Sequence, residues 1–474
     1  MRARHRSLDL FARYVGPEWR RVAILGFLVA ASIALQLAAP QLLRSFIDNA
    51  IGGADVDVLV RIAILFVAIA LGQQLAAALA TYLGESIGWV ATNAMRADLA
   101  LHCLTLDLGF HKARTPGELI ERIDGDVTAL AGFFSRFIVN VLGNVVLLIG
   151  VLIVVAFAVG GWLWTIGAIS VGTVYLLFYY TELLRRPIEA FRRELEDMQR
   201  AIASLGRVDE LMRTSSAVVD GLAALPTGAL GVELDGVSFG YDAGLVLRDV
   251  SVRIEPGRVL GILGRTGSGK TTLARLLVRF YDPTSGAVRL GGVDLRDAAL
   301  DSVRSHATLV SQDVQLFSAS VRDNLTLFDR RIDDAQLTDV LARVGLGSWL
   351  RAQPGTDPLG AEMTSGGLSA GEAQLLAFAR VFLRDPGLVV LDEASSRLDP
   401  VTERHVERAI DALLANRTAI VIAHRLATVD RCDEILILED GRVAEYGSRA
   451  ALASDPGSRF AQLLRIGLEP VLAP

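Results

Sequence analysis

The chain has 474 residues, which is too long for one ordinary core and excludes a single small domain. Hydrophobic residues make up 52% of it and the mean hydropathy is +0.42, which argues against a wholly soluble protein and indicates membrane spans. The net charge of −6, without a long run of one sign, gives no reason to expect nucleic acid as a partner. Cys103 and Cys432 lack metal-binding spacing, so we expect two reduced thiols.

The first half contains three uncharged stretches, which we interpret as four membrane spans. Two of them are each long enough for one helix across a ~30 Å hydrocarbon core. The third, residues 137–181, would be about 68 Å long as a single helix, so it has to fold back. We expect the turn at Gly160-Gly161, which tryptophans suited to the membrane interface flank. The predicted spans are 22–43, 62–84, 137–159 and 162–181.

Basic residues flank these spans on alternate sides. Arg20 and Arg21 precede the first span, and Arg185 and Arg186 follow the fourth. Because positive flanks stay in the cytoplasm, we predict a multi-pass plasma-membrane protein, surrounded by lipid, with its N-terminus and its second half cytoplasmic. A cleaved signal peptide is the alternative interpretation of the first stretch, but its length and the later spans favour an uncleaved helix.

The domain prediction is a transmembrane domain over 1–213, a linker over 214–231 and a second domain over 232–474, whose function the motifs below indicate. The linker is assigned from its Ser, Ala, Gly and Pro content. After it, short strands alternate with helices, which is typical of an α/β domain with a partly parallel sheet.

A phosphate-binding loop organises the second half. Its sequence fits G-x-x-x-x-G-K-[ST] and lies between an apolar strand and a predicted helix. Glycines let backbone N–H groups wrap phosphates, and the helix N-terminus adds partial positive charge. We expect Lys270 to reach the β- and γ-phosphates of ATP and Thr271 to ligate Mg²⁺. The predicted nucleotide-binding residues here are Gly264, Arg265, Thr266, Gly267, Ser268, Gly269, Lys270, Thr271 and Thr272.

An acidic motif follows the phosphate loop and supplies the other residues predicted for catalysis. The apolar strand 388–391 ends in Asp392 and Glu393. An aspartate at such a strand end is the expected Mg²⁺-holding carboxylate, and Glu393 could polarise water as general base. The alternative, two solvated acids that begin a loop, fits poorly beside a phosphate loop.

Residues 368–374, LSAGEAQ, resemble the LSGGQ signature of ATP-binding cassette (ABC) proteins, and other motifs follow that family's order. Tyr241 resembles the aromatic residue that stacks on adenine, Gln312 the glutamine loop, Asp399 the D-loop and His424 the switch histidine. Taken singly, Tyr241 and His424 would be read as a packed aromatic and a core histidine.

The resemblance implies how these residues act. Ser369 and Gly371 would contact the γ-phosphate of ATP held by an opposite subunit, and Asp399 would lie at the same nucleotide interface. Gln312 would join Thr271 and Asp392 at Mg²⁺. The residues implied for hydrolysis are Glu393, His424, Gln312 and Lys270.

The fold class implied is an α-helical transmembrane domain plus an α/β P-loop ATPase domain of the ABC type. The function implied is an exporter half-transporter that works as a homodimer, or as a heterodimer with a second ABC half-transporter. The apolar spans permit a lipid or hydrophobic substrate without selecting one. A soluble importer subunit is disfavoured because the spans and the cassette share one chain.

The chain departs from the family's pattern in two places, and the first departure, in the membrane half, motivates an alternative function. Exporters of this type usually carry more spans and a second long cytoplasmic excursion, whereas four spans and one excursion are predicted here. The alternative is a membrane-anchored ABC ATPase that does not transport. In the signature, Ala370 replaces a glycine and Glu372 replaces a glutamine. Since the remaining motif residues are present, we expect a competent site.

Overall fold

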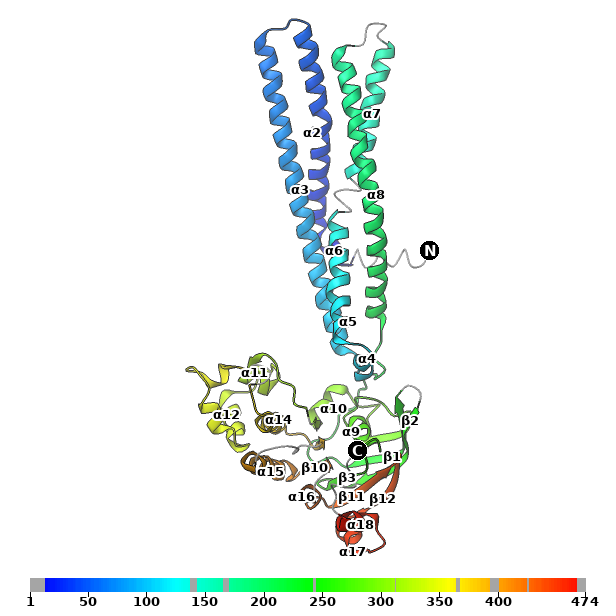
Figure 1. The fold of residues 1–474 in the computed structure, drawn as a ribbon, viewed down its shortest axis with the longest axis vertical. Helices are drawn as coiled ribbons and strands as arrows, with labels where there is room; N and C mark the ends of the chain where they lie inside the picture. Colours follow the sequence, from blue (N-terminus) through cyan, green and yellow to red (C-terminus); the bar gives the residue numbers. More distant parts are fainter. Residues whose placement is uncertain are drawn as a thin grey trace. The chain divides into compact units, whose positions relative to one another are not determined.

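The computed structural model describes residues 13–136, 143–164, 170–241, 244–311, 313–363, 367–392, 400–423 and 426–466. The chain forms two compact units (Figure 1). The first contains Met1–Leu106 and Phe110–Ser216, and the second contains Asp107–Gly109 and Ala217–Pro474. The predicted fold class, a helical transmembrane part and an α/β part, is confirmed.

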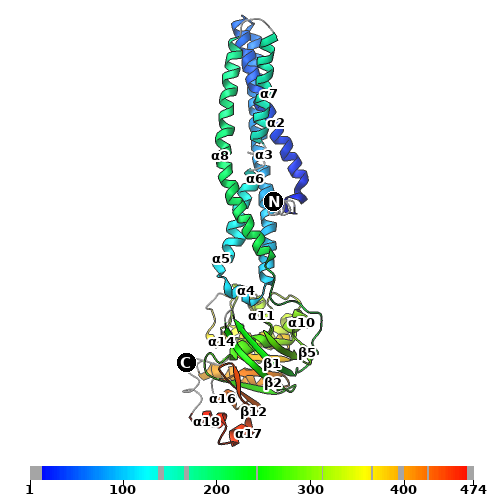
Figure 2. The ribbon, with the colours of Figure 1, turned by 90° about the vertical axis from the view of Figure 1, so that its right-hand side faces the viewer.

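The first unit is a bundle of long helices. Four of them run side by side in both views of the ribbon (Figures 1 and 2). The helices are η1 (Gly16–Glu18), α2 (Trp19–Ile51), α3 (Val56–Thr105), α5 (Pro116–Ile120), the π-helix η2 (Glu121–Gly125), α6 (Asp126–Arg136), α7 (Gly143–Trp164) and α8 (Val171–Arg213), and α4 (Leu108–Ala113) has residues of both units.

Two helices of the described chain are long and apolar enough to cross a bilayer. They cover Arg13–Ile51 and Val56–Thr105, and a shorter apolar helix covers Gly143–Phe157. The first two predicted spans, 22–43 and 62–84, lie within α2 and α3. Residues 137–142, the start of the third predicted span, lie outside the described residues.

The predicted turn at Gly160-Gly161 is wrong, because α7 continues through both glycines to Trp164. The cause lies at the start of α8, where Ser170 caps the helix by accepting the N–H of Thr173 at 3.1 Å. Asp48 of α2 adds a second cap: it accepts the N–H of Gly172 at 3.0 Å and the hydroxyl of Ser170 at 2.9 Å. Capping hydrogen bonds rather than glycine content therefore set this boundary.

After α3, the described residues as far as Arg136 are mostly helical. Thr115 caps α5 by accepting the N–H of Glu118 at 3.3 Å, and Pro116 is the first helical residue. Further along, Arg207 of α8 donates from Nε to Asp126 Oδ2 at 2.8 Å. Burial alone raises the pKa of Asp126, but hydrogen bonds from Arg207 and Ser204 lower it below its usual value.

The second unit contains two main sheets, whose strands Figure 2 draws as arrows. The six-stranded sheet has the order β12-β11-β3-β10-β9-β6, and its neighbours are parallel except for β12. An antiparallel sheet has the order β2-β1-β4-β5, and β7 pairs with β8. The strands are β1 (Val232–Tyr241), β2 (Gly244–Ile254), β3 (Val259–Leu263), β4 (Ser285–Leu290), β5 (Val293–Asp294), β6 (Ala307–Val310), β7 (Ala319–Ser320), β8 (Glu362–Met363), β9 (Leu388–Asp392), β10 (Thr418–Ile422), β11 (Glu434–Glu439) and β12 (Arg442–Ser448).

Alternation along the parallel strands divides the core into two layers. In β9, Val389 and Leu391 belong to the cluster that contains α14, whereas Leu388 and Val390 pack with α9 and the antiparallel sheet. The helices of this unit are α9 (Lys270–Leu277), α10 (Leu300–His306), α11 (Val321–Thr326), α12 (Asp334–Arg343), α13 (Gly347–Arg351), η4 (Pro358–Gly360), α14 (Ala370–Arg384), α15 (Pro400–Leu414), α16 (Leu426–Val429), α17 (Arg449–Ser454) and α18 (Arg459–Ile466).

Most of the predicted linker is part of the second unit. Residues 217–231, here called the strap, hydrogen bond to it: the N–H of Gly221 donates to Ala298 O at 3.2 Å. The buried Arg279 donates to Val219 O at 2.6 Å and to Ala298 O at 2.7 Å. A Cβ on Gly221 would lie 2.2 Å from Asp297 O, so a larger residue does not fit. The composition of the strap correctly indicates irregular backbone. Hydrogen bonds nevertheless hold that backbone against the second unit.

Candidate nucleotide-binding site

The sheet topology brings the predicted site residues to one edge. The phosphate loop follows β3, and Asp392 ends β9 opposite Ile422 of β10. Because β3, β10, β9 and β6 are parallel, their carboxyl ends meet at the same edge, where α/β proteins bind ligands. The predicted residues Gln312, Glu393, Asp399 and His424 lie outside the described residues.

The glycines of the phosphate loop fix its path. Gly264, Gly267 and Gly269 have φ values of 149°, 85° and 102°, in the region that favours glycine. A Cβ on Gly264 would lie 2.4 Å from Leu438 O, and one on Gly269 would lie 2.6 Å from Leu247 Cδ2. The loop therefore needs glycine both for its dihedral angles and for the approach of neighbouring backbone.

Two buried polar side chains face into this loop and suit a phosphate chain. Lys270 is buried, and its Nζ donates to Gly264 O at 2.6 Å and to Arg265 O at 3.0 Å. The buried Ser268 Oγ has no hydrogen-bond partner in the part of the chain that the structure describes. A buried hydroxyl without a partner is costly, so an anion that accepts its proton would relieve the cost. The residues present thus fit ATP phosphates.

The other loop residues divide between the tip and the helix. Arg265 and Thr266 are exposed at the tip, and Thr271 is half-buried. Thr272 is buried, and its Oγ1 accepts the hydroxyl proton of Tyr241 at 3.3 Å. Thr272 therefore contacts the antiparallel sheet, which leaves Thr271 as the threonine available to a metal ion.

Tyr241 lies in an aromatic cluster beside α9. Its ring centroid is 5.0 Å from that of Phe239 and 5.3 Å from that of Tyr281, and both contacts are edge-to-face. Arg275 of α9 donates to the Tyr241 hydroxyl at 3.3 Å. The sequence analysis missed Phe239, Tyr281 and Arg275 as supports of this ring; the alternation of Phe239 and Tyr241 along β1 was the available signal.

Asp392 and the signature segment take the predicted secondary structure. Asp392 is half-buried at the end of β9, whose other residues are fully buried. Ser369 is exposed and caps α14, and Gly371 is buried in its first turn. Across the described ranges, no three His, Cys, Asp or Glu side chains are grouped to hold a metal ion. A Mg²⁺ ion bound chiefly through phosphates and water needs no such group.

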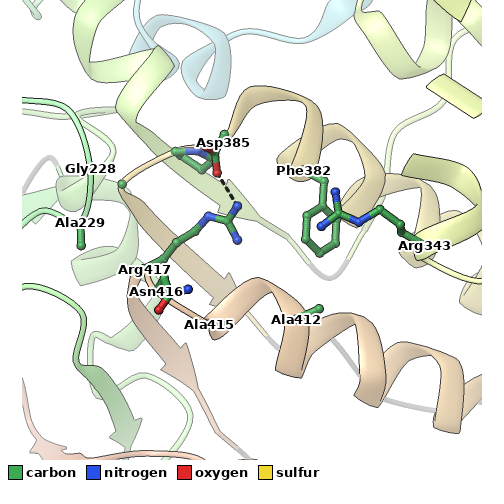
Figure 3. A pocket seen from close by; sticks show the side chains of 11 residues that line it. Gly228, Ala229, Arg343, Phe382, Asp385, Ala412, Ala415, Asn416 and Arg417 are labelled. Atoms are coloured by element: carbon green, nitrogen blue, oxygen red, sulfur yellow. Dashed lines mark hydrogen bonds and ion pairs between the residues drawn. The ribbon is translucent and has the colours of Figure 1, made fainter. Parts of the chain in front are cut away.

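A cavity of about 450 Å³ lies at the opposite edge of the sheet (Figure 3). Its lining includes Gly387, which precedes β9, and Arg417, which precedes β10. Arg417 forms an ion pair with Asp385, and Arg343 stacks over the ring of Phe382 with its Cζ 5.0 Å from the centroid. Because it adjoins the amino ends of these strands, this cavity is not the nucleotide site.

Two family models match the chain. The model for the ABC transporter transmembrane region matches residues 22–204, and that for the ABC transporter domain matches residues 247–396. A bacterial Atm1-family ABC exporter with ATP bound has the same fold, with a TM-score of 0.81 at 23% identity over 94% of this chain and 98% of that one.

Curated relatives are similar over a shorter part of their length. A multidrug efflux ATP-binding/permease protein of Mycobacterium bovis is 39% identical over 61% of this chain and 24% of the relative. An ATP-dependent lipid A-core flippase of Thiobacillus denitrificans is 37% identical over 62% and 51%. A fatty acid ABC transporter ATP-binding/permease protein of Mycobacterium bovis is 31% identical over 78% and 59%. The chain thus spans between a quarter and three fifths of these relatives.

Proposed function

Because this chain belongs to the ABC transporter family, with a membrane region and an ATP-binding domain, we propose that it hydrolyses ATP as one half of a dimeric exporter. The single observation that carries the proposal is the phosphate loop, where Lys270 and the unpartnered Ser268 hydroxyl line a glycine-built cradle. Such a cradle binds the phosphates of a nucleotide by backbone amides and one lysine.

The site residues keep the roles proposed for them from the sequence. Thr271 and Asp392 hold Mg²⁺ with Gln312, and Lys270 compensates the charge on the β- and γ-phosphates. Glu393 orients and deprotonates the attacking water, and His424 assists.

The composite site needs two chains. Tyr241 stacks on the adenine of the nucleotide in its own chain. Ser369 and Gly371 contact the γ-phosphate of the nucleotide in the opposite subunit, and Asp399 lies at the interface. Dimerisation, with a second copy or a related half-transporter, therefore creates the active form, and ATP biases its closure.

For the membrane half, we propose a multi-pass arrangement in the plasma membrane with the N-terminus and the cassette in the cytoplasm. Arg20 and Arg21, before the first predicted span, and Arg185 and Arg186, after the fourth, support this orientation. The substrate class is hydrophobic or amphiphilic. Large apolar side chains cover the outer surfaces of the helices, and the relatives are named for drug efflux, a lipid and fatty acids.

The second candidate is a membrane-anchored ABC ATPase that does not transport. The observation in its favour is that the described part of the first unit has four long helices and one region of short helices, between α3 and α7. ATP-driven flux of a lipid or dye into sealed vesicles would contradict this candidate.

The test is ATPase activity of the purified protein in lipid, over a range of protein concentrations, against a Glu393→Gln control. Activity that rises more than linearly with concentration and disappears in the control supports composite sites formed by self-association. Intact ATP binding without hydrolysis at any concentration contradicts the homodimer and points to a different half-transporter as partner.

A further inference from the structure

Helix α14 begins with a closed capping box that carries a negative charge. The N–H of Glu372 donates to Ser369 Oγ at 3.2 Å, and the N–H of Ser369 donates to Glu372 Oε2 at 2.9 Å. Two donors at the helix start are therefore satisfied within the chain. For the isolated helix this arrangement is favourable, because the carboxylate faces the positive end of the helix dipole.

Three other donors remain at the same helix start. The N–H groups of Ala370 and Gly371 donate to no acceptor among the described residues. The Ser369 hydroxyl accepts a hydrogen bond through its oxygen and keeps its own proton to donate. These donors are the groups that would receive an anion at the signature.

The carboxylate and such an anion compete for one helix end. In the proposed composite site, the γ-phosphate of the opposite subunit's nucleotide approaches Ser369 and Gly371. Glu372 lies on the first turn of α14 and is fixed there by its bond to the Ser369 N–H, so its charge cannot withdraw without opening the box. The carboxylate of Glu372 and the phosphate are both negative and therefore repel each other. When the interface closes, the solvent that screens this repulsion is removed.

We propose that Glu372 raises the ATP concentration needed for the two cassettes to close. Glu372 is thus a positioning residue: it holds Ser369 in place, and its negative charge opposes the incoming phosphate, so that closure onto a nucleotide-filled partner needs more ATP. This inference rests on the proposed function, because it assumes that the signature meets the partner's nucleotide.

The decisive variant is Glu372→Gln, because an amide oxygen can accept the Ser369 N–H while the negative charge is lost. We expect the half-saturating ATP concentration for self-association of the full chain, measured by light scattering in detergent on a Glu393→Gln background, to fall about three- to tenfold. Glu362→Gln, which removes one exposed charge from β8, is the matched control and should leave the half-saturating ATP concentration unchanged.

Glu372→Ala separates charge from capping. It should lower the same ATP concentration while also lowering the melting temperature, whereas Glu372→Gln should lower the ATP concentration alone. An unchanged or raised ATP requirement in Glu372→Gln, or association that does not respond to ATP in either variant, overturns the inference. Because association is measured without hydrolysis, a wild-type chain that associates with ATP but does not hydrolyse it would contradict the proposed function and leave this inference standing.

Discussion

The two units bury their hydrophobic side chains in different places. In the second unit the strands of the parallel sheet are covered on both faces, and Leu388, Val389, Val390 and Leu391 are fully buried. In the first unit, side chains such as Phe27, Leu71 and Phe157 are more than two-thirds exposed along the helices, at 72%, 67% and 78%. A protein core is sealed by its own chain, whereas a membrane bundle leaves that surface to lipid.

Polar groups differ in the same way. In the second unit several lie at one sheet edge, where Lys270 begins the helix after the β3 loop and Asp392 ends β9, with β10 between the two strands. In the bundle, polar side chains satisfy helix backbone: Tyr180 donates to Leu37 O at 2.7 Å, close to Pro40, which interrupts the α2 hydrogen-bond ladder. Polar groups in the first unit thus hold helices together, whereas those at this edge of the second unit line the proposed nucleotide site.

The largest expected effect is at the phosphate loop. Lys270→Ala should reduce ATP hydrolysis by about 10³-fold, because it removes the buried ammonium group that lies within the phosphate loop. Steady-state ATPase assays in lipid measure this. A variant that keeps more than a tenth of the activity with an unchanged melting temperature would place the nucleotide elsewhere.

A pair of leucine variants tests the contrast between the units directly. Leu376→Ala, at a fully buried position of α14, should cost about 2–5 kcal/mol of unfolding free energy through lost burial and a cavity. Leu71→Ala, on the exposed surface of α3, should cost less than about 1 kcal/mol. Denaturant unfolding in detergent measures both. Equal costs would contradict the assignment of the α3 surface to lipid.

The Asp126–Arg207 pair predicts a pH dependence in the helical region between the spans. The folded pKa of Asp126 is lowered from its ordinary 3.8, so the unfolded chain takes up protons first as the pH falls. Its stabilisation is complete above pH 3.8 and is lost as the pH drops through the folded pKa. Asp126→Asn should cost about 1–3 kcal/mol at neutral pH and flatten the melting temperature between pH 5 and about 3 relative to the parent protein.

A smaller and more local effect concerns the second cap of α8. Asp48→Ala should cost about 1 kcal/mol, because Gly172 N–H and Ser170 Oγ lose their acceptor while the Ser170 cap remains. Hydrogen exchange should accelerate at the first turn of α8 and not at its last. Exchange that stays slow at residues 172–174 would show that Asp48 is dispensable there.

The sequence predicted those features that depend on local patterns. The phosphate loop and the strand ending in Asp392 each combine residues within a few positions, and the structure forms both elements there. The turn before α8 was misplaced because its cap includes Asp48, a residue 122 positions from Ser170. The strap was misjudged for the same reason, since Arg279 and Asp297 that bind it lie far along the chain.

The strap also determines the boundary at which the second unit can be excised or fused to another membrane domain. Arg279 follows α9, which begins at Lys270, so its hydrogen bond to Val219 ties the strap to the segment directly after the phosphate-loop helix. A cassette excised at Val232 would lose these hydrogen bonds and expose the buried Arg279. Any exchange of membrane halves between related chains should therefore carry residues 217–231 with the cassette, because their hydrogen bonds attach them to it.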